Sequence, residues 1–372
     1  MKVLAIGAAV LICLAGLSML YALPVSSRKR ISFKKALAET WSDYSFIAVF
    51  AVIFLAYWYV TPTLKMSGAM NILRHSAVIG IMALGMGIVV ITGEIDLSVG
   101  SMLAFVGGLT VLVFNQTNNI VLTAAAALSL GALCGLINGV LVGKAKMPAF
   151  IVTLATMLIF RSLIRYTCHE FPQLTGGGNS LFKMLSSNSR MMPLYKFGNS
   201  KVLQVPMSGW ILVGLTMIVV YITTSTKFGK QLYAVGSNER AARLAGINVD
   251  NRRIMVFVIS GILTGTSAFL WVAMNGSVDP ATTGVSNEMY AIAAVVLGGI
   301  SMSGGRGKCL GILFGVMSYT VIDKIITAMK MNTLIQDGVK GAILILVIII
   351  QTMSPVIKEY FVRKKMRRQS AR

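Results

Sequence analysis

The chain has 372 residues, of which 56% are hydrophobic and only 12% are charged, and this composition excludes a water-soluble globular protein. A net charge of +22 would suggest nucleic-acid binding in a soluble protein, but in a membrane protein the distribution of Lys and Arg matters more than their sum. We therefore expect a membrane protein without a nucleic-acid partner. Neither a disulfide framework nor a zinc site is indicated, because the four cysteines are widely spaced: Cys13, Cys134, Cys168 and Cys309.

Apolar runs dominate the sequence. A bilayer core about 30 Å thick requires about 20 apolar residues of helix. Candidate spans occur at 3–23, 44–62, 76–93, 98–115, 121–143, 149–167, 209–224, 255–275, 290–302, 309–330 and 337–354. The run at 290–302 is short and contains glycine, so we expect a broken helix there. The predicted fold class is all-α, a polytopic helical membrane protein with about ten core transmembrane helices and one extra N-terminal helix.

Lys and Arg in the connecting segments predict the orientation, since short basic loops stay in the cytoplasm. With the N-terminus outside, most of the 34 Lys and Arg residues fall in segments that face inward, and the C-terminus is cytoplasmic. Anionic membrane lipid is then a partner for the basic tail at 355–372. Residues 1–43 form the extra helix and a basic linker, and 44–354 form the core. The basic cluster of the first run follows its apolar residues, which favours a retained helix over a cleaved signal peptide.

The stretch GEIDLSVGS at 93–101 places acidic residues between two apolar runs. Ionisable side chains at membrane depth are costly and usually mark a pathway, so Glu94, Asp96, Ser98 and Ser101 are candidates for lining a translocation path. Three interpretations of Asp96 stay open. It caps the helix that starts near Ser98, it contacts a passing solute, or it lies at the membrane interface.

Two long segments connect the apolar runs. The outer one, 168–208, is polar and rich in Gly and Ser, and we expect a docking surface, a flexible lid or an ordinary loop. The inner one, 225–254, contains SNERAARLAG, which predicts a short amphipathic helix with Ser237 or Asn238 as its N-cap and Gly246 as its stop. Such a helix is either a contact for a cytoplasmic partner or a solvated helix without one.

A second interruption, LGGISMSGGRGK, is loosely parallel to ITGEIDLSVGSM. Val90-x-x-Gly93 corresponds to Val296-x-x-Gly299, and Gly100-x-x-Leu103 corresponds to Gly307-x-x-Leu310. Glycine-broken segments in corresponding halves of a transporter indicate a translocation path. We therefore predict two loosely related halves with helix breaks at Gly93, Gly100, Gly299, Gly304 and Gly305.

One further acid lies in an apolar run. Asp323, in VIDKIIT, is either a pathway residue or a partner in a helix–helix hydrogen bond. No catalytic or metal site is predicted. GGRGKC at 304–309 lacks the glycine and the Ser or Thr of a phosphate-binding loop, and the neighbours Cys168, His169 and Glu170 are more typical of an ordinary loop than of a metal site.

Five segments, in this order, carry a resemblance to a known family: GEIDLSVGSM, FIVTLATMLIFRS, TKFGKQLYAVGSNERAARLAGINV, AIAAVVLGGISMSGGRG and VKGAILIL. Over residues 44–354 the chain resembles the permease subunits of bacterial ATP-binding-cassette importers for monosaccharides, in the ribose, xylose and galactose branch. The stretch EIDLSVGSM is most similar to the xylose and multiple-monosaccharide members.

The resemblance implies a multi-pass protein of the bacterial inner membrane that is not itself an enzyme. It implies a dimer with a second permease copy or a paralogue, a monosaccharide delivered by an extracytoplasmic sugar-binding protein, and a separate ATPase subunit that uses ATP, so that this chain binds no cofactor. The ATPase would grip a coupling helix, carried over to Asn238, Glu239, Arg240, Ala241, Ala242 and Gly246.

Two other classes of function stay open. A proton-coupled secondary transporter would use Glu94, Asp96 or Asp323 as proton carriers and would need no ATPase. A membrane scaffold or receptor would need no translocation path. A requirement for ATP distinguishes the first alternative, and the lack of any solute flux distinguishes the second.

Overall fold

Long α-helices make up most of the described chain. The computed structural model describes residues 45–61, 66–331 and some positions between 335 and 349. Within these residues, seven helices are long and apolar enough to cross a membrane, and two shorter apolar helices accompany them. The chain is therefore a polytopic helical membrane protein. The helix expected at 3–23, the basic linker, the tail after 354 and most of the span at 337–354 lie outside the described residues, so the predicted count of ten core spans is not tested in full.

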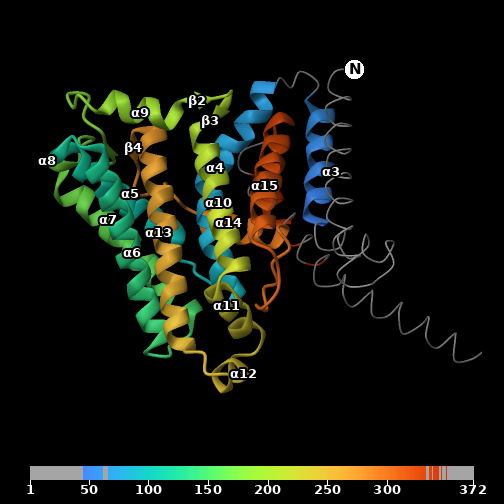
Figure 1. The fold of residues 1–372 in the computed structure, drawn as a ribbon. Coiled ribbons are helices and arrows are strands. Elements are labelled where there is room, and N and C mark those ends of the chain that lie inside the picture. The colour runs from blue at the N-terminus through green and yellow to red at the C-terminus, as the bar shows by residue number, and fades with distance from the viewer. Residues whose placement is uncertain are drawn as a thin grey trace, which may run out of the picture.

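The elements follow one another with short connections in most places. In chain order they are α3 (Ser45–Val60), α4 (Met66–Ile91), α5 (Val99–Thr117), α6 (Ile120–Gly143), α7 (Ala149–Glu170), α8 (Pro172–Thr175), β1 (Phe182–Lys183), α9 (Met191–Asn199), β2 (Lys201–Val202), β3 (Val205–Pro206), α10 (Met207–Ser225), α11 (Lys227–Ser237), α12 (Glu239–Leu244), α13 (Val249–Asn275), β4 (Ser277–Val278), α14 (Asn287–Leu297) and α15 (Leu310–Ala328). The long helices stand side by side, with α9 across one end and α12 at the other (Figure 1). We call these the α9 end and the α12 end.

Most predicted spans agree with the helices, but α4 is longer than expected. The apolar run suggested a start near residue 76, whereas the helix begins at Met66. Its first turns carry Asn71 and Arg74, which hydropathy counts against a span. In the fold, the Arg74 guanidinium donates to the side-chain oxygen of Asn199 at the end of α9, so this polar start is tied to α9. At α14 the expectation of a broken helix is confirmed, since this helix has only 11 residues.

A glycine seam joins α6 to α13. An added Cβ at Gly135 would overlap the carbonyl oxygen of Phe257, and one at Gly261 would overlap that of Gly131. Small residues spaced by four allow two membrane helices to approach backbone to backbone. The spacing of four is visible in the sequence of both helices. The α6 residues in the seam are Gly131, Gly135, Gly139 and Gly143.

The segment at 168–208 folds into a layer over the α9 end. The side chain of Asn115, near the end of α5, donates to the carbonyl of Lys183 at 2.9 Å and accepts from the amide of Leu185 at 3.0 Å. Phe182 and Leu194 of this segment are fully buried and belong to the main hydrophobic core of the helices. The segment is therefore held to the bundle by its own buried side chains, which argues against an unstructured loop.

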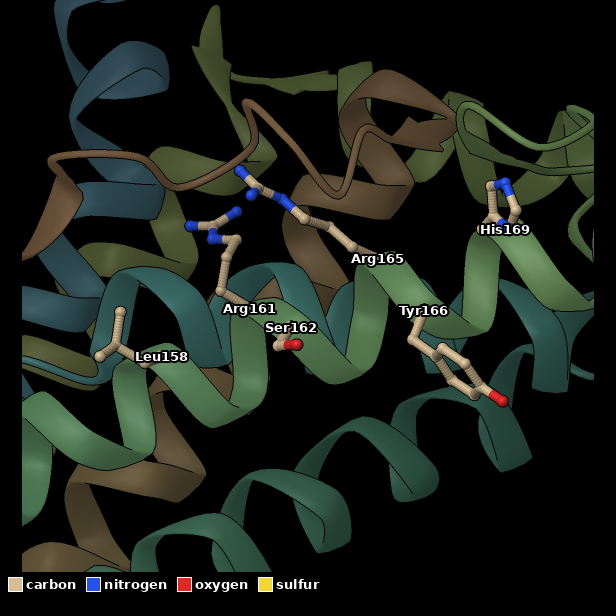
Figure 2. A pocket seen from close by; sticks show the side chains of 6 residues that line it. All are labelled: Leu158, Arg161, Ser162, Arg165, Tyr166 and His169. Carbon is tan, nitrogen blue, oxygen red and sulfur yellow. The ribbon is translucent and has the colours of Figure 1, made fainter.

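Helix α7 lies at the edge of the bundle. One of its faces lines an open hollow of about 540 Å³ toward the α9 end (Figure 2). The lining residues all come from this helix and follow its period: Leu158, Arg161, Ser162, Arg165, Tyr166 and His169.

The seam generates a prediction. Gly135→Ala should lower the free energy of unfolding by about 1–3 kcal/mol, because its methyl group would enter the packed contact with Phe257. The matched control is Gly214→Ala on α10, where an added Cβ meets nothing, and alanine's helix propensity should leave stability equal or slightly raised. Thermal melting of both purified variants in detergent measures the difference. Equal melting temperatures would contradict the packing described here.

Candidate functional site

The two predicted interruptions end their helices with the same backbone motif. After α4, the amide of Gly93 donates to the carbonyl of Val90 at 2.9 Å, and the next amide reaches Val89. After α14, the amide of Gly299 donates to the carbonyl of Val296 at 2.9 Å, and the next amide reaches Val295. Gly93 and Gly299 have φ of 85° and 80°, the left-handed conformation that this helix ending requires. The parallel seen in the sequence is therefore a parallel in local structure.

These interruptions also touch one another. The amide of Gly305 donates to the carbonyl of Ile91, the last residue of α4, at 2.9 Å. An added Cβ at Gly304 would lie 2.9 Å from the backbone of Gly93, and one at Gly236, near the end of α11, would overlap the carbonyl of Ile91. The Tyr233 hydroxyl of α11 donates to the 301–309 loop at 2.9 Å. Both breaks and α11 thus meet at the α12 end.

One predicted break is wrong. Gly100 is the second residue of α5 and has helical backbone, so the helix starts before it. Because Gly100 has no side chain, the backbone of Gly284 can pack directly against α5, and an added Cβ would overlap the carbonyl of Gly284. The corresponding second residue of α15 is Gly311, not Gly307, which lies in the preceding loop with φ of 123°. The sequence alignment of the halves was therefore out of register after the break.

Asp96 lies inside the protein, fully buried. One carboxylate oxygen accepts from the amide of Ser98 at 3.0 Å and from its hydroxyl at 2.6 Å, and the other accepts from the Ser260 hydroxyl of α13 at 3.3 Å. The Asn138 amide of α6 donates to the Ser98 hydroxyl at 2.9 Å. Ser101 is also buried, within α5. Among the interpretations of Asp96, this geometry favours a structural one, although the carboxylate binds the N-cap residue itself instead of the first turn of the helix.

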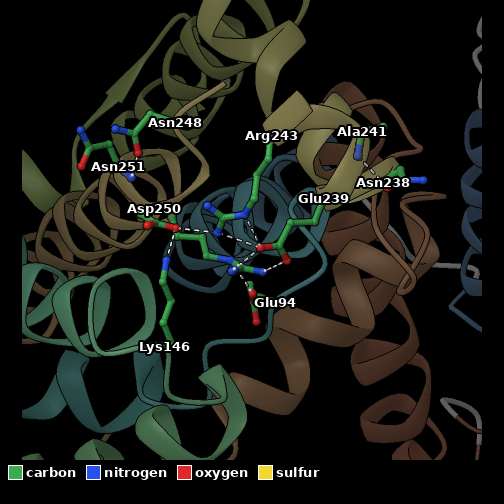
Figure 3. A network of polar contacts seen from close by, with 10 residues as sticks. Glu94, Lys146, Asn238, Glu239, Ala241, Arg243, Asn248, Asp250 and Asn251 are labelled. Atoms are coloured by element: carbon green, nitrogen blue, oxygen red, sulfur yellow. Dashed lines mark hydrogen bonds and ion pairs between the residues drawn. The ribbon is translucent and has the colours of Figure 1, made fainter. Parts of the chain in front are cut away.

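Glu94 starts a chain of ion pairs that leads to α12 (Figure 3). Its carboxylate lies 2.8 Å from Nε of Arg253 on α13, and both side chains are mostly buried, at 17% and 16% exposed. Nη2 of Arg253 lies 2.8 Å from the Glu239 carboxylate on α12. A single guanidinium thus bridges the α4–α5 break and the short helix at the α12 end.

The chain of ion pairs continues beyond Glu239. Nη2 of Arg243 lies 2.9 Å from the Glu239 carboxylate and 2.7 Å from the Asp250 carboxylate on α13. Lys146, in the α6–α7 connection, also pairs with Asp250. Three acids and three bases alternate, so the network is balanced in charge. Burial alone would raise the pKa of Glu239, but the hydrogen bond from Arg243 and the charge of Arg253 outweigh it and hold that pKa below its ordinary value.

The short helix α12 has the ends that the sequence predicts. The Asn238 side chain accepts from the amide of Ala241 at 3.0 Å, so Asn238 is the N-cap. Gly246 has φ of 78° and follows the last turn. Ala242 is buried in a small apolar cluster with Val235 of α11 and Val249 of α13, whereas Leu244 is 90% exposed. Arg240, Ala241 and Gly246 are exposed as well. The helix therefore presents an outward surface on a base fixed by ion pairs.

Asp323 lies apart from the other acids. It is near the end of α15 at the α9 end, and its carboxylate is 2.8 Å from Nζ of Lys340. The structure therefore does not bring Asp323 to Glu94 or Asp96. Sequence reasoning missed Arg253 and Asp250. A signal was present, since both residues are charged and lie in the first turns of an apolar helix, where such groups need a partner.

Metal-ligating residues do not cluster in the described ranges, where no group of three or more His, Cys, Asp or Glu side chains could hold an ion. His169 pairs with its neighbour Glu170 at 2.9 Å. The described cysteines, Cys134, Cys168 and Cys309, are free thiols and buried.

Comparison with known proteins gives a consistent result. Residues 68–348 match the family described as the branched-chain amino acid transport system permease component. The ribose import permease protein RbsC of Escherichia coli K12 is 33% identical over 322 residues, covering 86% of this chain and 97% of the relative. RbsC of Bacillus subtilis is 32% identical over 325 residues, 87% of this chain and 96% of the relative. The L-arabinose transport system permease protein AraH of E. coli K12 is 32% identical over 313 residues, 83% and 90% respectively. No solved structure matches the chain.

The ion-pair network predicts how α12 is held. Glu239→Gln keeps the side-chain size but removes the charge that pairs with Arg243 and Arg253, so amides at 238–246 should exchange hydrogen about tenfold faster, since charge-assisted hydrogen bonds are worth about 1.5–3 kcal/mol. Hydrogen exchange with mass spectrometry measures this. Glu170→Gln, an exposed acid that pairs with its neighbour His169, is the matched control and should leave the α12 amides unchanged. Unchanged exchange in Glu239→Gln would show that the network does not hold α12.

Proposed function

The chain belongs to the transport-system permease family matched above, and from this premise we propose that it is the membrane-spanning subunit of an ATP-driven monosaccharide importer. The family description names branched-chain amino acids, but relatives that align along most of this chain are ribose and arabinose permeases by name, and this supports a sugar as the cargo. The proposed location is the bacterial inner membrane, with the α12 end in the cytoplasm.

The proposal is carried by the way in which ion pairs attach α12 to the membrane-spanning bundle. A six-residue helix with exposed Leu244 and Arg240 projects from the membrane-spanning bundle, and Arg253 ties its base to the α4–α5 break. A rigid, outward helix of this kind suits a contact with a separate motor subunit. We propose that an ATPase subunit binds this surface and supplies ATP hydrolysis. A coupling role for Asn238, Glu239, Ala241, Ala242 and Gly246 belongs to the same proposal.

Two further partners complete the proposed transporter. A second permease subunit, identical or paralogous, would complete the membrane dimer, and an extracytoplasmic sugar-binding protein would dock on the layer at the α9 end. Among the acids, we propose that Asp96 and Ser98 support the α5 start instead of contacting sugar, since both are buried and bonded to one another. Asp323 and Ser101 stay candidates for the path.

Uptake into proteoliposomes tests the proposal. The purified chain would be reconstituted with its candidate ATPase and binding protein and supplied with labelled ribose, arabinose, xylose, galactose or leucine, with and without ATP. We expect uptake of a sugar that requires ATP and both partners. Uptake by this chain alone under a proton gradient would establish the secondary transporter instead, and ATP-dependent uptake of leucine only would refute a sugar cargo.

A surface variant tests the ATPase contact. Leu244→Asp places a charge at a position of α12 that is 90% exposed, and we expect the ATPase to bind about 30-fold or more weakly, as for loss of a central interface residue. Leu203→Asp is the matched control, because Leu203 is 84% exposed at the opposite end of the molecule. Copurification of the ATPase with each variant gives the result. Equal recovery with both variants would exclude α12 as the docking helix.

A further inference from the structure

An irregular segment enters the bundle between β4 and α14. Residues 279–286 are not helical, and an added Cβ at Gly100 would overlap the carbonyl of Gly284. Gly100 lies in the first turn of α5, roughly 25 Å along the helix from its end at the α9 side. The segment thus reaches membrane depth. Backbone without helical geometry at that depth is tolerated only where it is buried in protein or lines a water-filled cavity.

Two arginines of α7 hold this segment. Nη1 of Arg161 donates to the carbonyl of Thr283 at 2.6 Å and to that of Pro280 at 3.1 Å. Nη2 of Arg165 donates to the carbonyl of Ala281 at 3.4 Å. Three backbone carbonyls of the segment therefore accept hydrogen bonds from α7. Ala281 itself is exposed, so the segment has an open side next to these arginines.

The face of α7 beside this segment carries Ser162, Arg161 and Arg165 between the exposed side chains of Leu158 and Tyr166. Ser162 and Arg165 are exposed and about 12 and 8 Å along the helix from its end. Both line the hollow of about 540 Å³, a volume in the range of small-ligand sites (Figure 2). Charged side chains in membrane helices face a protein interior or a water-filled cavity, because lipid is a costly environment for them.

The neighbouring helix α6 shows what a lipid-facing surface of this protein looks like. Its exposed side chains are mainly aliphatic, among them Leu128, Leu133, Leu136, Ile137 and Val140. They carry no charge. Helix α7 also exposes aliphatic side chains, among them Leu158, Ile159 and Leu163, but unlike α6 it carries two arginines, Arg161 and Arg165. This difference in charge indicates that the two exposed faces meet different surroundings.

We propose that the arginine-bearing face of α7 and the segment 279–286 line a water-filled passage, and that Ser162, Arg165 and Tyr166 contact the sugar in it. Arg165 and Ser162 offer hydrogen-bond donors to sugar hydroxyls, and Tyr166 offers an apolar ring with a polar tip. Arg161 is a positioning residue, since its donors are engaged by backbone carbonyls. The inference rests on the proposed function for the identity of the ligand, and it places the sugar contact on α7 instead of at the buried pair Asp96 and Ser98.

Cysteine labelling in proteoliposomes tests this site. In Ser162→Cys, a water-soluble maleimide supplied on both sides of the bilayer should react about tenfold faster than in Ser129→Cys, because the reactive thiolate forms only in contact with water. Ser129 is an exposed serine on α6 at a similar distance from the α9 end. The parent chain, whose described cysteines are buried, gives the background rate. We further expect ribose or arabinose, but not sucrose, to slow the reaction of Ser162→Cys several-fold.

The outcomes separate this inference from the proposed function. Labelling of Ser162→Cys no faster than that of Ser129→Cys, both at rest and during ATP turnover, would overturn the passage even if sugar uptake is intact. Fast labelling that the transported sugar does not slow would overturn the sugar contact. Protection by sugar needs neither ATP nor uptake, so protection in a chain that transports nothing would support the site and refute the proposed importer.

Discussion

Backbone groups that leave helical geometry inside a membrane have no water to bond, and this constraint organises the described part of the protein. The break after α4 and the loop after α14 satisfy one another, since the amide of Gly305 donates to the carbonyl of Ile91. The segment before α14 is satisfied by Arg161 of α7. Each interruption is thus bound to an element far away in the chain. Because they are joined in this way, the breaks connect the bundle instead of weakening it.

The acids of the sequence stretch at 93–101 divide between two roles. Asp96 is enclosed with Ser98 and Ser260, where it fixes the start of α5 against α13. Glu94, two residues earlier, faces the α12 end and pairs with Arg253. The same short stretch therefore secures the interior and connects the bundle to its projecting helix. A force applied to α12 would reach the α4–α5 break through one guanidinium.

What could be predicted from the sequence depended on how local its cause is. Apolar runs predicted the described spans because hydrocarbon thickness sets helix length, and Asn238 predicted the start of α12 because the amide that donates to its side chain lies three residues away. The start of α4 was missed because Arg74 finds its partner in α9. The pairing of Glu94 with Arg253 and the grip of Arg161 on residues 280–283 depend on tertiary neighbours, which no local pattern encodes. The predicted alignment of the two halves was wrong after the break, because the loop between α14 and α15 is longer than the one between α4 and α5.

The glycine seam has a consequence for how the protein is made. Gly131 and Gly261 meet in the finished bundle, but roughly 130 residues separate them in the chain, and synthesis at about 5–20 residues per second takes roughly 6–25 seconds to cover that distance. During this interval α6 resides in the bilayer with its glycine face unpaired, while α7 and the layer at the α9 end are still being produced. During biogenesis the unpaired glycine face of α6 must therefore be kept from packing against another helix until α13 has been synthesised.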